Sequence, residues 1–223
     1  HFVNSMALRD LLERFDPPPP PEVVEAAAKL KYRDFLIVTL ILNNPDPFPD
    51  NWVYVHSPDI NVGRIQNFRA WSPEMVPEDD KSCIGMEYFC NIGDPLWQMN
   101  RDELVALASK ELGKLGLAPE ESVVDGAIIR QPKAYPVYDE EYQGCVEVIS
   151  GWIKSLENFH TCGRNGLHRY NNQDHSMLTA MLVAENILGG NHDVWNVNFE
   201  RSYHEEFQVS DKDKDKDKKP VAT

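Results

Sequence analysis

The fold is decided by the stretch GRNGLHRYNNQDHSMLTAMLVAENILGG, residues 163–190. It begins with Arg164 and an asparagine between two glycines, continues through polar side chains, and ends in an apolar helical pattern that two more glycines close. One capping residue is enough to start most helices, so the polar groups between Arg164 and His175 are more than a cap requires. We expect a buried helix over 174–188 with a binding site at its N-terminus. The alternative is that the polar residues only cap it.

The chemistry of a helix N-terminus indicates what such a site would bind. The first turn leaves backbone N–H groups unpaired and carries a partial positive charge. An electron-rich group is therefore favoured there, and phosphate is one candidate. The pyrimidine end of a reduced flavin is another.

Hydrophobic patterning predicts the remaining elements. Apolar residues at helical spacing predict four more helices, and the one over 101–115 has Asn100 as its cap, whereas Ser5 caps the first. These helices cover residues 8–15, 22–30, 101–115 and 140–156. Runs rich in β-branched and aromatic residues predict strands over 1–4, 33–43, 52–56, 62–71, 82–90, 123–130 and 158–162.

Short connections between the central strands favour an antiparallel meander. In the strand over 82–90, Ile84, Met86 and Tyr88 share one face, whereas Glu87 points to the other.

Composition excludes several classes of protein. The chain has 223 residues and a net charge of −14, which argues against nonspecific nucleic-acid binding. No apolar run is long enough to span a membrane, and we expect no secretory signal. The four cysteines form no CxxC pair and the histidines show no metal-ligand spacing, so we expect reduced thiols, no metal site and a cytoplasmic location. The tail over 210–223 alternates opposite charges, and we expect it to be disordered.

The stretch GRNGLHRYNNQDHSMLTAMLVAENI resembles the C-terminal flavin-contacting segment of the amine-oxidase-like flavoproteins, which include protoporphyrinogen oxidase and UDP-galactopyranose mutase. Three more segments carry the same resemblance. HFVNSMALRDLL is similar to the strand and helix by which such chains leave the flavin domain. QPKAYPVYDEEYQGCVEVI resembles the segment just before the chain returns to that domain. WVYVHSPDINVGRIQNFRAWSPEM fits the sheet domain between them.

The resemblance implies an α+β chain in two parts. The first is a mostly antiparallel sheet that forms the substrate domain, with helices, over 7–156. The second is the C-terminal remnant of an FAD-binding α/β domain, made of residues 1–6 and 157–200 lying together.

One feature of the family is missing from the sequence. No GxGxxG, the fingerprint that grips the FAD pyrophosphate, occurs anywhere in the chain. We therefore expect the chain to be the C-terminal half of a longer enzyme, with an N-terminal FAD-binding half on the same or a separate chain as its partner. Alone, it should be inactive and bind FAD weakly or not at all.

The resemblance also implies roles for individual residues. The residues at the flavin are Gly163, Arg164, Asn165, Gly166, Asp174, His175 and Ser176. Among them, the backbone of His175 and Ser176 would face the flavin N1 and C2 carbonyl, with Asp174 close to the ribityl chain. The substrate residues are Arg64, Asn67, Tyr135 and Tyr138, and Trp71 lies on the same sheet. Packing or surface roles are the alternative for Arg64, Trp71 and Tyr135.

Three functions remain open. The first is an FAD-dependent oxidoreductase acting on a small molecule. The second is a flavin-dependent sugar-nucleotide mutase, which AYPVY and GRNG favour, although HRYNNQD departs from the mutase pattern. The third is a non-catalytic binding or interaction domain, since the cofactor fingerprint is absent.

Overall fold

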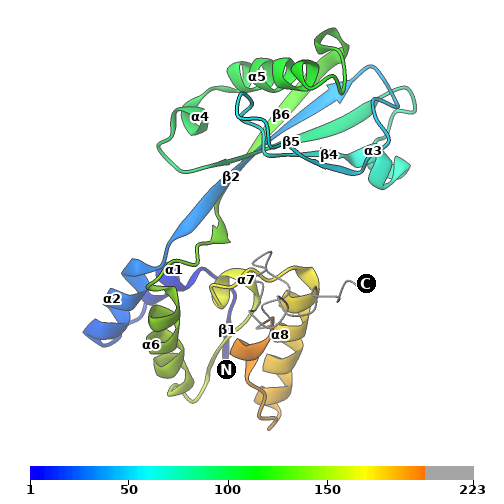
Figure 1. Cartoon of the computed structure of the whole chain (residues 1–223). Helices are drawn as coiled ribbons and strands as arrows, with labels where there is room; N and C mark the ends of the chain where they lie inside the picture. The colour runs from blue at the N-terminus through cyan, green and yellow to red at the C-terminus, as the bar shows by residue number, and fades with distance from the viewer. Residues whose placement is uncertain (199–223) are drawn as a thin grey trace, which may run out of the picture. The chain divides into compact units, whose positions relative to one another are not determined.

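The computed structural model describes residues 1–198, which Figure 1 draws in colour. The chain divides into two compact units. The sheet unit consists of residues 7–152, and the terminal unit combines residues 1–6 with the chain from residue 153 onward. The tail expected to be disordered, 210–223, lies outside the described residues, as do residues 199 and 200.

The sheet unit is built on five strands in the order β3-β4-β5-β2-β6. All neighbouring strands pair antiparallel, which confirms that part of the prediction. The predicted meander is correct only for β3, β4 and β5, because β2 lies between β5 and β6. The strands are β2 (Tyr32–Leu42), β3 (Trp52–Tyr54), β4 (Arg64–Asn67), β5 (Ser82–Cys90) and β6 (Val123–Pro136). β2 is long and apolar, and a position between two other strands buries more of its apolar surface than an edge position would. This accounts for its place between β5 and β6.

One face of the sheet packs against α5 (Arg101–Lys114), which Figure 1 shows lying along the strands. Leu36, Val38 and Leu40 alternate inward from β2 and are fully buried in one core cluster with Leu104 and Leu112 of the helix. The predicted cap is confirmed, since Asn100 Oδ1 accepts the N–H of Glu103 at 3.0 Å. The opposite face carries the other set of alternating side chains, including Arg64 and Glu87, which pair across β4 and β5.

Helices α1 (Leu8–Leu12), α2 (Pro21–Lys29) and α6 (Tyr142–Lys154) lie outside the sheet. Ser5 does not cap α1, because the helix begins after Ala7. Before the helix, Asn4 holds the chain in a turn, since its Oδ1 accepts the N–H of Met6 at 3.0 Å. The remaining short helices are α3 (Phe68–Trp71), η1 (Pro73–Met75), α4 (Pro95–Gln98) and η2 (Glu120–Ser122).

The strand predicted over 62–71 is too long. The strand β4 ends at Asn67, and α3 follows it directly. Asn67 accounts for the change, because its Oδ1 accepts the N–H of Ala70 at 3.2 Å and so starts a helical turn.

The terminal unit joins the two ends of the described chain. The strand β1 (Phe2–Asn4) pairs in parallel with β7 (Phe159–Thr161), so the two segments predicted to lie together do so. After β7 come the single turn α7 (Gly163–Gly166), the helix α8 (Gln173–Ile187) and η3 (Val194–Asn196).

The helix α8 is not buried all round, contrary to the prediction. Thr179 and Val183 are buried, whereas Met177 and Met181 are 66% and 59% exposed. The apolar pattern alone could not distinguish these two faces, because both carry apolar residues. Within residues 1–198, none of the helices is long and apolar enough to cross a bilayer.

Candidate functional site

Hydrogen bonds between neighbouring segments hold the β7–α7 junction in place. Gly163 has a φ of +83°, a left-handed conformation that favours glycine. Its N–H donates to Thr179 Oγ1 at 3.0 Å, and its carbonyl accepts Asn171 Nδ2 at 3.1 Å. Gly166 lies so close to β1 that a Cβ there would meet Asn4 O at 3.1 Å. Both glycines are therefore required by the local geometry, whatever the loop binds.

Arg164 stabilises the same loop. Its guanidinium lies 4.2 Å from the centre of the Tyr170 ring, and Nη1 donates to Asn171 O at 3.1 Å. The charge is thereby fixed in position within the loop that precedes α8.

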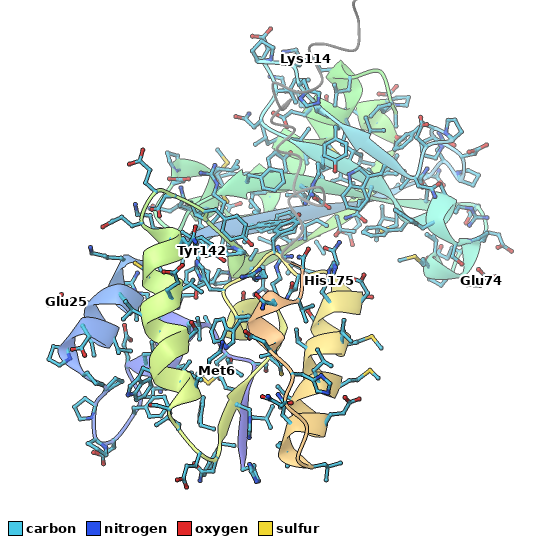
Figure 2. The ribbon with its side chains drawn as sticks, turned by 60° about the horizontal axis from the view of Figure 1, so that its bottom comes forward. Met6, Glu25, Glu74, Lys114, Tyr142 and His175 are labelled. Atoms are coloured by element: carbon cyan, nitrogen blue, oxygen red, sulfur yellow. The ribbon has the colours of Figure 1, made fainter. Side chains whose placement is uncertain are left out.

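The N-terminus of α8 has two open donors. The N–H of Ser176 donates to Asn172 O at 3.0 Å, so it is already used within the helix. The N–H groups of Gln173 and Asp174 have no hydrogen-bond partner among residues 1–198. The N–H of His175 donates to the side chain of Asn172. The N–H groups without a partner are therefore those of residues 173 and 174, two residues before the predicted His175 and Ser176. Figure 2 labels His175 in this first turn.

Asn165 adds an acceptor that the fold leaves open. Its Oδ1 is buried and accepts no hydrogen bond from the described residues. A buried acceptor without a donor is costly, so a group outside these residues is expected to supply one. The carboxylate of Asp174 is exposed and lies 3.3 Å from His175 Nδ1.

A separate cavity is found in the terminal unit. A cavity of about 630 Å³ runs along β7 and the C-terminal part of α8, with His160, Asn186 and Trp195 in its lining. None of the residues predicted to contact a flavin lines it. The open donors of α8 are thus not part of this cavity.

The sheet unit brings Arg64 and Tyr135 together on the face away from α5. Arg64 Nη2 donates to Tyr135 Oη at 2.6 Å, and Nε donates to Glu87 Oε2 at 2.6 Å. Glu87 is 1% exposed and also accepts the amide of Gln66 on its other oxygen. Three strands therefore contribute to one polar cluster.

Aromatic rings surround the guanidinium of Arg64. Its carbon Cζ lies 4.8 Å from the centre of the Phe89 ring, 5.1 Å from Trp52 and 5.8 Å from Tyr135. Burial works against the charge of Arg64, but the neighbouring Glu87 and Tyr135 outweigh it and raise the pKa of Arg64 above its ordinary value. The guanidinium is positively charged at any physiological pH.

The other predicted substrate residues are not part of this cluster. Asn67 is buried on the core side, where its Nδ2 donates to Phe48 O at 2.8 Å. Tyr138 lies 4.4 Å, ring to ring, from Tyr142, which Figure 2 labels at the start of α6. Trp71 contacts Trp52 edge to face, with the ring centres 6.1 Å apart.

Sequence reasoning did not identify Glu87, Gln66, Trp52 or Phe89 as site residues. Glu87 carried a signal, because it is the single charged residue in the apolar strand over 82–90 and its facing direction was predicted. Gln66 follows Arg64 by two residues, which places both on one face. The aromatic partners could not be found this way, since ring contacts across strands depend on strand order.

The fold is similar to that of several solved structures, whereas the sequence matches no protein-family model and no curated protein. A reduced UDP-galactopyranose mutase aligns with a TM-score of 0.72 at 19% identity, over 88% of this chain and 43% of that one. A protein from Exiguobacterium sp. 255-15 assigned as a protoporphyrinogen oxidase gives 0.62 at 13% identity, over 83% and 40%. Putrescine oxidase bound to putrescine gives 0.59 at 15% identity, over 84% and 42%. The chain thus spans less than half the length of the structures it resembles.

Proposed function

We propose that this chain is the C-terminal part of an FAD-dependent oxidoreductase. In this proposal the terminal unit, as the remnant of an FAD-binding domain, contacts the edge of the flavin, and the sheet unit supplies substrate-contacting residues. The observation that carries the proposal is the first turn of α8, where the N–H groups of Gln173 and Asp174 have no partner among the described residues. The likeness in fold to a mutase, a protoporphyrinogen oxidase and putrescine oxidase supports it.

The residues present fit a flavin in kind. The pyrimidine end of the ring system carries carbonyl acceptors and one N–H donor. The two open N–H groups of α8 match the acceptors, and the buried Asn165 Oδ1 matches the donor. When bound, FAD would supply the two-electron acceptor for substrate oxidation.

The N-terminus of α8 would also tune the cofactor. The partial positive charge of the helix start favours negative charge placed beside it. Arg164 adds a full positive charge in the preceding loop, held there by Tyr170 and Asn171. Both effects favour the reduced flavin and raise its reduction potential. Asp174 would contact the ribityl chain through its exposed carboxylate.

On the sheet unit, Arg64 and Tyr135 are the proposed substrate contacts. They lie on the face away from α5 and combine a ring with a guanidinium. Tyr138 is exposed and remains a proposed contact. Asn67 is not, because its side chain is buried and both of its polar atoms are hydrogen-bonded within the unit.

The open donors can be tested by a substitution that removes one N–H and little else. Gln173 is the first residue of α8, where proline is tolerated, and Asn172 before it has the extended conformation that proline requires (φ −80°, ψ −176°). In the complete enzyme, Gln173→Pro should lower the flavin reduction potential by roughly 30–60 mV, because a charge-assisted hydrogen bond contributes about 1.5–3 kcal/mol. Spectroelectrochemical titration measures the shift.

Gln173→Ala is the matched control, since it removes the same side chain and keeps the N–H. If both variants bind FAD fully and have the same potential, the start of α8 does not contact the flavin. If the complete protein binds no flavin at all, the reading as a non-catalytic binding domain is favoured instead.

A flavin-dependent sugar-nucleotide mutase is the second candidate, supported by the TM-score of 0.72 to a UDP-galactopyranose mutase. The two reactions differ in electron balance. An oxidoreductase consumes one electron acceptor for each substrate molecule, whereas an isomerisation consumes none. Anaerobic turnover of sugar nucleotides by the reduced complete enzyme, without loss of the reduced flavin, would establish the mutase.

A further inference from the structure

The face of the sheet away from α5 contains a charged side chain whose charge is already balanced. The side chain of Arg64 is 11% exposed and that of Glu87 is 2% exposed. Glu87 Oε2 accepts Arg64 Nε at 2.6 Å and Arg64 Nη2 at 2.5 Å, and Oε1 accepts the amide of Gln66. The pair therefore carries no net charge, and both oxygens of the carboxylate are occupied.

One donor of this cluster remains open. Arg64 uses Nε and Nη2 on Glu87 and Tyr135, whereas Nη1 has no hydrogen-bond partner in the part of the chain that the structure describes. The rings of Trp52 and Phe89 lie against the guanidinium and are themselves partly exposed. Tyr54, which pairs with Arg64 across β3 and β4, is exposed beside them. The surface thus combines flat aromatic walls with the unpaired Nη1 group of Arg64.

An arginine on an open surface normally attracts carboxylates and phosphates, because its fork of donors matches their oxygens. At this site the fork is already occupied by Glu87. A second anion would meet a neutralised guanidinium and the nearby negative carboxylate, with only Nη1 to bind it. Repulsion by Glu87 therefore offsets what the arginine would contribute.

We infer that Glu87 is a specificity-determining residue, which makes this face select an uncharged, ring-bearing ligand with one hydrogen-bond acceptor and reject the anionic counterpart. The ring stacks among Trp52, Tyr54 and Phe89, and the acceptor binds Arg64 Nη1. This inference rests on the proposed role of the sheet unit in holding substrate. The diphosphate of a sugar nucleotide would not contact Arg64 in this arrangement, although a sugar or base ring could.

Benzamide and benzoate form a suitable pair of probes, because they have nearly the same size and shape and differ in charge. Titration of the full 223-residue chain, followed by the chemical shifts of the tryptophan indole N–H signals, measures both affinities without a flavin. The wild-type chain should bind benzamide about tenfold more tightly than benzoate. In Glu87→Gln the affinity for benzoate relative to benzamide should rise by about tenfold or more, since the guanidinium is no longer neutralised.

Glu111→Gln is the matched control. Glu111 is also a buried carboxylate of the sheet unit, but it lies on α5 and accepts the N–H groups of Asn61 and Val62 at 2.7 and 3.1 Å. Its substitution should leave the ratio of affinities unchanged. If Glu87→Gln does not fold, the double variant Arg64→Leu/Glu87→Leu replaces the ion pair by apolar side chains. This double variant should bind benzamide more weakly than the wild-type chain does, and its affinity for benzoate should not increase.

Equal or tighter binding of benzoate by the wild-type chain would overturn the inference. So would the absence of binding of either probe at millimolar concentration, or an unchanged ratio in folded Glu87→Gln. These outcomes are separate from the flavin proposal, because the titration needs no cofactor. The flavin reduction potential of the Gln173→Pro variant, in turn, does not depend on the face of the sheet that holds Arg64.

Discussion

Arg164 stabilises the loop before α8 and, in the proposed function, also acts on the cofactor. Its guanidinium contacts the Tyr170 ring at 4.2 Å and donates to Asn171 O, so its position is set before any ligand binds. A fixed charge needs no reorganisation when the flavin is reduced, which is why such groups are effective.

The residue-scale prediction is that Arg164→Met lowers the flavin potential of the complete enzyme by roughly 30–60 mV, because loss of the positive charge disfavours the reduced flavin. Arg164→Lys keeps the charge and is the control. Spectroelectrochemical titration checks both. A shift below about 10 mV with FAD fully bound would leave Arg164 as a loop-stabilising residue only.

At the scale of elements, α8 has two apolar stripes with different environments. Val183 is 2% exposed and packs inside the terminal unit, whereas Met181 is 59% exposed. The helical period places these positions on different faces although they are two residues apart.

We therefore expect Val183→Ala to lower the free energy of unfolding of this chain by about 2 kcal/mol, through lost burial and the cavity left behind. Met181→Ser should change it by less than about 0.5 kcal/mol, as exposed substitutions usually do. Urea unfolding of both variants measures the difference. Equal losses would mean that Met181 is buried in solution, for instance by self-association, which light scattering would reveal.

At the scale of the whole molecule, the chain spans less than half the length of the structures that it resembles and carries no GxGxxG. Most of the affinity for a dinucleotide cofactor comes from the grip on its pyrophosphate. The edge contacts proposed for α8 are few by comparison.

The purified 223-residue chain should therefore be colourless, even after incubation with FAD. Its visible absorbance after gel filtration, compared with the protein concentration, gives the flavin content. One equivalent of bound flavin would show that the described residues, or a second copy of the chain, supply a grip that the sequence does not reveal.

The sequence by itself determined the elements whose signals are local. The alternation of buried and exposed residues in β2 follows from the pleat of a strand. The capping box of α5 depends on residues within one helical turn. The turn at residues 163 and 166 requires glycine, because the backbone of residue 163 is left-handed and the backbone around residue 166 leaves little room for a side chain. The resemblance carried by residues 163–187 together with three further segments of the sequence also indicated the family of structures that the fold resembles.

Only the tertiary structure decided what depends on distant pairing. The position of β2 between β5 and β6 and the exposed side of α8 each follow from packing against segments that are far away in the sequence. The cluster of Arg64, Glu87 and Tyr135 has the same origin, because its members lie on three strands and meet only when the register is set. Strand order and register belong to the assembled sheet, so the sequence could mark Glu87 as unusual but could not identify it as the partner of Arg64.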